Sequence, residues 1–166
     1  MSKQRSAVVF GARNLGRAII ELLVSDGWAV TGVARSKSTL DGVRAAGARA
    51  LEGDVTDPAS VYGALKHAAG AHGGVDLAVN AAAANGGQRS GPFGGGQLAE
   101  ADLDGFDAWA TAPARAAFSF LSAAARFAIA QQPPATLVQV TGGSARRALP
   151  GRGLWAAGSF LSLIHI

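Results

Sequence analysis

Gly11-Ala-Arg-Asn-Leu-Gly16-Arg-Ala18 is the stretch of sequence that decides the fold. It follows a short apolar run, Ala7-Val-Val-Phe10, and opens a segment whose apolar residues recur at helical spacing from Leu15 to Leu23. An apolar run, a glycine turn and an amphipathic segment in this order predict a buried strand, a tight turn and a helix. Backbone amides and the helix dipole at such a turn can hold a pyrophosphate group.

Two interpretations of this turn stay open. Against the fingerprint G-x-G-x-x-G, Gly11 and Gly16 supply the first and third glycines, and Arg13 stands at the second. The turn either binds a dinucleotide or carries its glycines for steric reasons alone. If it binds one, we expect the side chain of Arg13 to crowd the pyrophosphate.

The alternation of apolar runs and helix-length segments continues along the chain. Further apolar runs predict strands at residues 28–33, 48–51, 75–79 and 136–141, and the segments between them predict helices at residues 38–46, 58–69 and 102–130. Because each strand is apolar on both faces, we predict an α/β fold, a doubly wound parallel sheet of the Rossmann type with five recognisable strands. Asp57 is placed to cap the helix that Pro58 begins, and Pro113 is expected to kink or divide the long Ala-rich helix.

The end of the second predicted strand, Val33-Ala-Arg35-Ser36-Lys37, indicates which dinucleotide would bind. An acidic residue at this place binds the ribose of NAD, whereas a basic one accommodates the 2′-phosphate of NADP. Arg35 offers a planar fork to a phosphate, and Lys37 and Arg13 can add charge nearby. We therefore expect NADP(H) to be preferred over NAD(H). The alternative is a solvated start to the second helix.

The composition excludes several kinds of site. The 166 residues include no cysteine, so a disulfide framework and a thiol nucleophile are impossible, and the three histidines are too scattered to suggest a metal site. Hydrophobic residues make up 49% and charged residues 16%, which is typical of a folded chain. No apolar run approaches the length of a membrane span or a signal-peptide core, so we expect a cytoplasmic protein without a membrane partner.

The net charge of +4 comes from one part of the sequence. Up to Asp107 there are ten basic and eleven acidic residues, and after it there are five arginines and no acid. A basic balance raises the question of nucleic-acid binding. These arginines are spread over separate elements without stacking aromatics, so we expect no nucleic-acid partner.

From about Ala7 to about Phe160 the sequence resembles the short-chain dehydrogenase/reductase family. The stretch that begins at Gly11 resembles the family's glycine-rich turn with one residue deleted. Three further segments keep the family's order, namely the adenine-contacting segment at Asp54-Val55, the Asn-Asn-Ala-Gly stretch at Asn80-Ala81, and Gly91-Pro-Phe93 ahead of a helix at residues 106–126.

This resemblance implies a dinucleotide-binding domain and names the residues that would form its site. The predicted cofactor-binding residues are Gly11, Arg13, Asn14, Leu15, Gly16, Arg35, Ser36, Asp54, Val55, Asn80 and Ala81. The resemblance also implies that the helix from Ala114 to Ala130 forms a homo-oligomer.

The catalytic residues of the family are not matched. In the family an Asn, a Ser, a Tyr and a Lys cooperate in moving a proton at the carbonyl oxygen. In register these four positions fall on Pro113, near Gly142, on Trp155 and on Ser159. The indole of Trp155 donates a hydrogen bond but is no practical acid or base. The single tyrosine, Tyr62, lies on the third predicted helix.

Two hydroxyls after the fifth predicted strand are the remaining catalytic candidates. Thr141 and Ser144 would lie at the carboxyl end of that strand, where either could donate to a substrate carbonyl. The alternative is that both hydroxyls satisfy local backbone amides.

The leading hypothesis is an NADP-dependent oxidoreductase that passes a hydride between nicotinamide and a carbonyl or alcohol substrate. The alternative is a non-catalytic dinucleotide-binding module or an inactive fragment of such an enzyme. A basic nucleic-acid binder is a third and weaker hypothesis, which rests on charge alone.

The predicted domain covers residues 1–160, and residues 161–166 form a tail that does not continue the preceding helical pattern. A doubly wound dinucleotide fold has six strands in the order 3-2-1-4-5-6, of which five are recognisable before the sequence stops. The tail resembles read-through of sequencing-adapter DNA, so we expect a truncated reading frame without its closing strands. A short natural form is the alternative.

Overall fold

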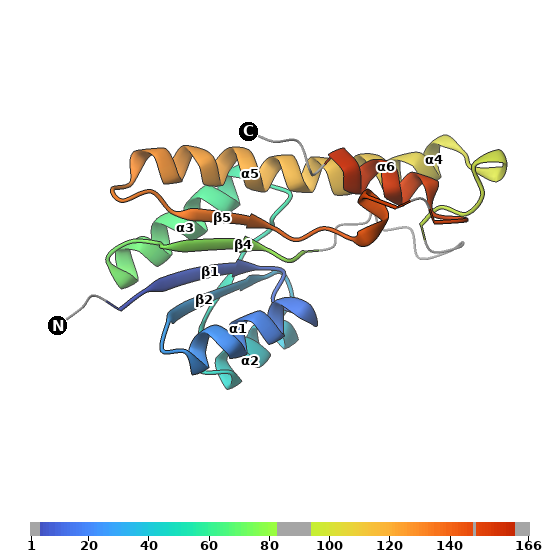
Figure 1. Ribbon diagram of the computed structural model, residues 1–166. Coiled ribbons are helices and arrows are strands. Elements are labelled where there is room, and N and C mark those ends of the chain that lie inside the picture. The colour runs from blue at the N-terminus through green and yellow to red at the C-terminus, as the bar shows by residue number, and fades with distance from the viewer. Residues whose placement is uncertain (1–3, 83–93, 148, 162–166) are drawn as a thin grey trace. The chain divides into compact units, whose positions relative to one another are not determined.

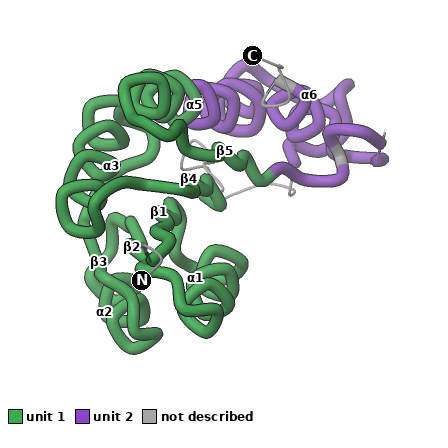
Figure 2. Tube along the Cα trace, turned by 60° about the vertical axis from the view of Figure 1, so that its left-hand side comes forward, with its two compact units in different colours: residues 1–82, 119–140 green, residues 83–118, 141–166 purple. Residues whose placement is uncertain are grey.

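The computed structural model describes residues 4–82, 94–147 and 149–161 (Figure 1). The chain divides into two compact units (Figure 2). Unit 1 contains residues 1–82 and 119–140, and unit 2 contains residues 83–118 and 141–166. The predicted limits of a domain at residues 1–160 and a tail at residues 161–166 stay a prediction.

Unit 1 is built on a parallel sheet of five strands. The strands are β1 (Ser6–Phe10), β2 (Ala29–Ala34), β3 (Arg49–Glu52), β4 (Leu77–Asn80) and β5 (Thr136–Gln139). They lie in the order β3-β2-β1-β4-β5 and every neighbouring pair is parallel. This confirms the predicted doubly wound sheet, and it places the reversal of strand order between β1 and β4. Ligands of such sheets bind outside the carboxyl ends of the strands at this reversal.

Helices cover both faces of the sheet. The helices α1 (Leu15–Ser25) and α2 (Lys37–Ala45) lie on one face, and α3 (Pro58–His72) and the unit 1 part of α5 (Ala112–Ala130) lie on the other (Figure 1). All five residues of β1 are buried, because successive side chains of the central strand point into the two layers. Val9 packs in a cluster with Ile20 and Val43 from α1 and α2.

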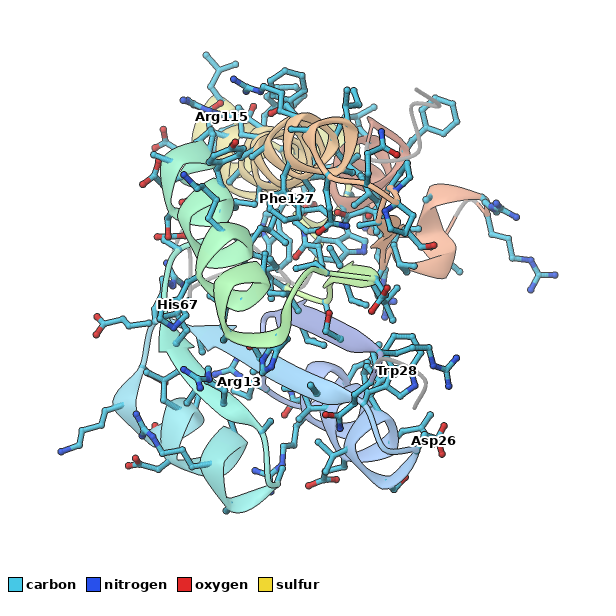
Figure 3. All side chains as sticks on the ribbon, turned by 90° about the vertical axis from the view of Figure 1, so that its left-hand side faces the viewer. Arg13, Asp26, Trp28, His67, Arg115 and Phe127 are labelled. Atoms are coloured by element: carbon cyan, nitrogen blue, oxygen red, sulfur yellow. The ribbon has the colours of Figure 1, made fainter. Side chains whose placement is uncertain are left out.

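On the opposite face, aromatic pairs join the sheet, α3 and α5. Phe10 meets Phe120 edge-on, with 5.5 Å between ring centroids. Phe127 of α5 lies next to α3 and packs against Tyr62 at 6.2 Å (Figure 3). The single tyrosine of the sequence is therefore a packing residue of α3. Edge-to-face pairs of this kind contribute roughly 0.5–1.5 kcal/mol beyond the area they bury.

Capping residues define the ends of α3. The carboxylate of Asp57 accepts hydrogen bonds from the amides of Ala59 and Ser60, at 2.9 and 3.2 Å, and Pro58 occupies the first turn. Gly73 ends the helix with a φ of 74°, in the left-handed region. The predicted cap at Asp57 is confirmed.

Side chains tie the amino ends of β1, β4 and β5 together. Asp76 accepts from the amide of Ser6 at 2.7 Å, and the hydroxyl of Ser6 donates to the carbonyl of Gly74 at 2.6 Å. The side-chain amide of Gln131 makes two hydrogen bonds to the backbone of Val75, at 2.8 and 2.7 Å. These bonds satisfy backbone groups at or just before the first residue of a strand, where no neighbouring strand supplies a partner.

Unit 2 is mainly helical. Its elements are η1 (Leu98–Glu100), α4 (Leu103–Phe106), the π-helical segment η2 (Asp107–Thr111), the first turns of α5, η3 (Gly143–Ala145) and α6 (Gly153–Leu161). Trp109 of η2 packs edge-on against Trp155 of α6, with 5.7 Å between centroids. A side chain at Gly158 would overlap the backbone of Trp109 and Ala110, so this glycine permits the close approach of α6 to η2.

The expected irregularity at Pro113 is present as a change of helix type. The amide of Ala112 donates to the carbonyl of Asp107, five residues earlier, which is π-type bonding. Pro113 follows directly and has no amide for the next α-helical bond. The Ala-rich stretch is thus divided into α4, η2 and α5. The segment Gly91-Pro-Phe93, which the sequence resemblance singled out, lies outside the described residues.

Candidate functional site

The turn between β1 and α1 requires glycine at two positions. Gly11 has a φ of 78°, and a Cβ atom there would overlap the backbone of Ala82. A Cβ atom at Gly16 would overlap the carbonyl group of Gly11. The first glycine therefore allows the turn and the last allows α1 to start against it. Both glycines are required for steric reasons, so they do not by themselves indicate a phosphate-binding site. The surrounding groups decide whether the turn can bind a phosphate.

The strained residue of this turn is Asn14. Its φ of 48° and ψ of −111° match the first central position of a type II′ turn, which favours glycine. The fingerprint places Arg13 at the middle glycine, whereas in the structure the conformation that favours glycine lies one residue later. The side chain of Arg13 is exposed. Strain of this kind costs about 1–3 kcal/mol and is concentrated at functional sites.

The N-terminus of α1 has no side-chain cap, unlike the N-termini of α2 and α3. Ser36 caps α2 by accepting from the amide of Thr39 at 3.4 Å, and Asp57 caps α3. Among residues 4–82, 94–147 and 149–161, no side chain accepts from the first amides of α1. An uncapped helix start at the carboxyl end of β1 leaves donors and positive potential directed at the place where a sheet of this type binds its ligand.

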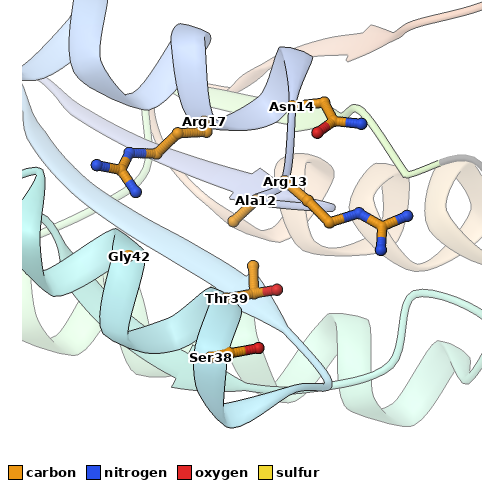
Figure 4. Close-up of a pocket in the computed structure, with 7 residues that line it drawn as sticks. All are labelled: Ala12, Arg13, Asn14, Arg17, Ser38, Thr39 and Gly42. Atoms are coloured by element: carbon orange, nitrogen blue, oxygen red, sulfur yellow. The ribbon is translucent and has the colours of Figure 1, made fainter.

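A depression of about 330 Å³ lies between this turn and α2. Its lining consists of Ala12, Arg13, Asn14, Arg17, Ser38, Thr39 and Gly42 (Figure 4). The side chains of Arg13 and Arg17 extend in different directions, and Arg17 reaches over Gly42, where a Cβ atom would crowd its guanidinium. Arg17 also pairs with Glu21 at 2.6 Å. The depression is thus lined by two guanidinium groups and two hydroxyls, of which Arg17 is paired with a carboxylate and Thr39 is bonded to the hydroxyl of Ser36 at 2.7 Å.

Sequence reasoning named Arg13 and Asn14 but not Arg17, Ser38 or Thr39. Arg17 lies in the first turns of α1, directly after the glycine turn, and this position in the sequence was the available signal. The hydroxyls of Ser38 and Thr39 follow directly on the basic end of β2.

Arg35 and Asp54 meet at the carboxyl ends of β2 and β3. Arg35 Nη1 lies 3.6 Å from Asp54 Oδ2, and the Arg35 side chain is 75% exposed. Asp54 Oδ1 also accepts from the amide and the hydroxyl of Thr56, at 2.9 and 2.8 Å. Burial raises the pKa of the Asp54 carboxyl, but the Thr56 hydrogen bonds and the charge of Arg35 outweigh it, so that this pKa lies below its ordinary value.

The remaining predicted cofactor residues fall into buried and exposed groups. Val55 is buried, Leu15 and Ser36 are exposed, and Ala81 is half-buried. Asn80 is only 1% exposed, and its side chain is already engaged. It accepts from the amide of Ala82 at 3.0 Å and donates to Gln139 Oε1 at 2.9 Å. Asn80 can therefore shape the site, but its amide group is not directed at a ligand.

These features of unit 1 fit a dinucleotide. The glycine turn lies at the carboxyl end of β1, the start of α1 has no side-chain cap, and exposed arginines flank the ends of β1 and β2. Within the described residues there is no group of three or more His, Cys, Asp or Glu side chains that could hold a metal ion. In the same part of the chain, no helix has the length and apolar character needed to cross a membrane.

The candidate catalytic hydroxyls belong to unit 2. Thr141 Oγ1 donates to the carbonyl of Ser159 at 3.4 Å, and Ser144 lies in η3, where its side chain is outside what the structure describes. At the positions of the family's Tyr and Lys, Trp155 packs against Trp109, and Ser159 is buried. These contacts are those of a packed helix pair.

The fold and the glycine turn define an α/β domain of the dinucleotide-binding type. The family model described as enoyl-(acyl carrier protein) reductase matches residues 9–159. The chain therefore belongs to the short-chain dehydrogenase/reductase family, as the sequence resemblance predicted. None of the curated proteins matches it.

Solved structures of the family share the fold. A short-chain dehydrogenase/reductase from Serratia marcescens is 24% identical, with a TM-score of 0.71 over 97% of this chain and 65% of its own. One from Burkholderia phymatum, in complex with NAD, is 23% identical, with a TM-score of 0.76 over 97% of this chain and 58% of its own. A 3-oxoacyl-[acyl-carrier protein] reductase from Brucella melitensis is 19% identical, with a TM-score of 0.75 over 96% and 66%. The chain thus spans about two thirds or less of the length of these structures.

Proposed function

We propose that unit 1 binds a nicotinamide dinucleotide across the reversal of strand order between β1 and β4. The observation that carries this proposal is the turn from Gly11 to Gly16, where two sterically required glycines lead into an uncapped helix. Amides at the start of α1 would hold the pyrophosphate, and Asp54 with Val55 would line the adenine pocket at the end of β3. Leu15, Asn80 and Ala81 complete the proposed binding residues, Asn80 through its effect on the backbone.

NADP(H) is the proposed cofactor, in preference to NAD(H). Arg35 directly follows β2 with an exposed guanidinium, and Ser36 is the next residue. Arg13 lines the depression beside the glycine turn, and these residues are the proposed 2′-phosphate cluster. A planar guanidinium donates two parallel hydrogen bonds to a phosphate, and such charge-assisted bonds are roughly twice as strong as neutral ones. The 2′-phosphate distinguishes the two dinucleotides, so this cluster favours the one that carries it.

The proposed reaction is hydride transfer between the dinucleotide and a carbonyl or alcohol substrate. The nicotinamide supplies or accepts the hydride, and the protein must hold the substrate oxygen and move its proton. Thr141 and Ser144 are the hydroxyls proposed to donate to that oxygen. An aliphatic hydroxyl can orient the substrate oxygen through a hydrogen bond, but it is not a general acid or base of the kind that His, Asp, Glu, Lys or Tyr supplies.

A second candidate function is dinucleotide binding without turnover. The packing of Trp155 against Trp109, at the position of the family's tyrosine, favours it. An indole donates one hydrogen bond but does not release its proton at neutral pH. In this case the chain holds the dinucleotide as a binding module.

One experiment on the full chain separates these functions. The chain is titrated with NADPH and with NADH, and thermal unfolding is followed at each concentration. NADPH oxidation is then measured with a panel of ketones and aldehydes. Protection without oxidation above background supports the binding module, and oxidation supports the reductase. Absence of protection by either dinucleotide would reject both.

A homo-oligomer formed through α5 is also proposed. Phe118 and Ile129 are 72% and 78% exposed, and their spacing of eleven residues places them on one stripe of the helix. Exposed aromatic and branched apolar side chains on one helix stripe are typical of a helix that packs against a second copy.

A further inference from the structure

We infer that Gln139 is a positioning residue for the glycine turn and that it acts through Asn80 and the backbone at Ala82. Gln139 is the last residue of β5, on the opposite side of β4 from the turn. The inference rests on the proposed function in one respect, because its effect on ligand affinity presumes that the turn binds a dinucleotide.

The first link joins the side chains of Gln139 and Asn80. The two residues are partners in the parallel register of β4 and β5, and Asn80 Nδ2 donates to Gln139 Oε1 at 2.9 Å. Gln139 Nε2 donates to the carbonyl of Val140, also at 2.9 Å, so the orientation of its amide group is defined. Because Asn80 is 1% exposed, loss of this acceptor would leave a buried donor unpaired.

The second link joins Asn80 to the backbone that follows it. Asn80 Oδ1 accepts from the amide of Ala82 at 3.0 Å, and Ala81 donates its own amide to the carbonyl of Phe10 at 2.9 Å. An Asn side chain that bonds to a backbone amide two residues later fixes the conformation of the intervening turn. With Nδ2 held by Gln139, the oxygen of Asn80 stays directed at Ala82.

The third link is steric. The backbone of Ala81 and Ala82 occupies the space where a Cβ atom of Gly11 would lie. The carbonyl of Gly11 in turn stands where a Cβ atom of Gly16 would lie. A shift of Ala82 therefore changes the space available to Gly11, and through it the start of α1.

Other contacts hold the strands together, so the side chain of Gln139 is not needed for the sheet itself. The amide of Val140 donates to the carbonyl of Asn80 at 2.9 Å, and the ladder pairs four residues of β4 with four of β5. Gln131 bonds to Val75 at the amino end. Removing the Gln139 amide should loosen residues 80–82 and leave β4 and β5 paired.

The test compares Gln139→Leu with Gln139→Glu and with Val138→Thr, all in the full chain. Leucine removes both hydrogen bonds, glutamate keeps an oxygen for Asn80, and Val138 is the neighbouring β5 residue outside the relay, 39% exposed. Amide hydrogen exchange at Ala82 is measured without ligand, and the Kd for NADPH is measured by titration. For Gln139→Leu we expect about fivefold faster exchange at Ala82 and a Kd about fivefold higher, the factor for one net hydrogen bond.

We expect Gln139→Glu to restore most of both properties and Val138→Thr to change neither. In an Asn80→Ala background, adding Gln139→Leu should have no further effect on the Kd, because the relay is already broken. Unchanged exchange at Ala82, an unchanged Kd for NADPH, or equal acceleration along all of β4 and β5 would overturn the inference. If the native chain binds neither dinucleotide, the proposed function fails by itself, and exchange at Ala82 still decides whether Gln139 holds the turn.

Discussion

Arg35 and Asp54 form an ion pair that joins the carboxyl ends of β2 and β3, with 3.6 Å between Nη1 and Oδ2. The guanidinium proposed to bind a 2′-phosphate therefore already has an anionic neighbour. Exposed pairs of this kind contribute about 1 kcal/mol or less, so Asp54 restrains Arg35 without preventing it from contacting a ligand. If unit 1 binds a dinucleotide as proposed, the preference between NADP(H) and NAD(H) would depend on the balance of charge between these two residues.

Arg35→Asp should reverse the order of protection by the two dinucleotides. The native chain is expected to be protected against thermal unfolding more by NADPH than by NADH, and the variant more by NADH, with a loss of at least tenfold in NADPH affinity. Arg44→Asp is the matched control, because Arg44 pairs with Asp41 at the other end of α2 and carries the same charge. Equal protection of the native chain by both dinucleotides would remove Arg35 from the 2′-phosphate role.

Asp54→Asn should strengthen NADPH binding by about two- to fivefold and leave NADH binding nearly unchanged. Asparagine keeps an oxygen that accepts from Thr56, but it removes the negative charge beside Arg35. The gain should shrink as salt is added, because an exposed charge is screened. Titration at two salt concentrations measures this, and weaker binding of both dinucleotides would mean that Asp54 acts through the adenine pocket instead.

Asn14→Gly should raise the free energy of unfolding by about 1 kcal/mol. Asn14 has the φ of 48° at which glycine is relaxed, and its side chain makes no capping hydrogen bond that would be lost. Asn14→Ala should lower stability, because alanine tolerates this conformation less well than asparagine. Urea unfolding checks both variants, with an unchanged slope as the sign that only stability has changed. Stabilisation by alanine would show that the turn is not strained at this residue.

Protonation of His72 should destabilise the fold in mild acid. Burial, together with the charges of Arg49 and His67, lowers the pKa of His72 below its ordinary value of 6.5, and its Nε2 lies 3.3 Å from the buried hydroxyl of Thr31. The folded state thus holds the neutral ring, and the unfolded state takes up the proton first. Stability is therefore full above about pH 6.5 and falls as the pH drops towards the folded pKa.

His72→Gln should make the free energy of unfolding depend less on pH, in the range between neutral pH and the pKa of His72 in the folded state. His67→Gln is the control, since burial and Arg49 still act on His72 in that variant. Urea midpoints measured across this range give the slope for each. A native slope that persists in His72→Gln would assign the acid sensitivity to another group.

Ile129→Asp should shift the chain to a smaller assembly in size-exclusion chromatography with light scattering. A carboxylate at a 78% exposed position costs little in a monomer but is unfavourable in a helix interface between copies. Leu22→Asp on α1 is the control, at an exposed apolar position outside α5. An unchanged mass for Ile129→Asp would exclude this part of α5 from an interface.

The architecture of unit 1 was predictable because the spacing of apolar residues and the residue types that form turns are local properties of the sequence. The apolar runs predict β1 to β5, and their alternation with helices leads to the observed parallel sheet. Strand ends differ where long-range contacts intervene. Trp28, labelled in Figure 3, was expected in β2, but its amide donates to the carbonyl of Leu23. The centroid of its ring lies 4.2 Å from the guanidinium carbon of Arg5. Val75 is bonded to Gln131 from a distant segment, so β4 begins at Leu77.

The types of residue at the candidate site could be predicted from the sequence, but their arrangement in space could not. The glycine turn and the basic end of β2 are visible in the sequence, but the position of the strained backbone is not, because φ at Asn14 depends on where α1 packs. The bond between Asn80 and Gln139 joins residues 59 positions apart, and only the strand register brings them together. Arg17 becomes part of the depression because Gly42, on another helix, leaves it room.

The amino ends and the carboxyl ends of the strands carry different kinds of interaction. This difference has a consequence for how the protein tolerates mutation. At the amino ends, the side chains of Ser6, Asp76 and Gln131 hydrogen-bond to the backbone and are not proposed to contact a ligand. At the carboxyl ends, the backbone of Asn14 is strained and the side chain of Arg35 is an exposed charge. A survey of all single substitutions, scored separately for abundance in cells and for dinucleotide capture, should divide along this axis. Variants of the residues at the amino ends would lose abundance and capture together, whereas variants of exposed side chains at the carboxyl ends, such as Arg35, would remain abundant after capture is lost.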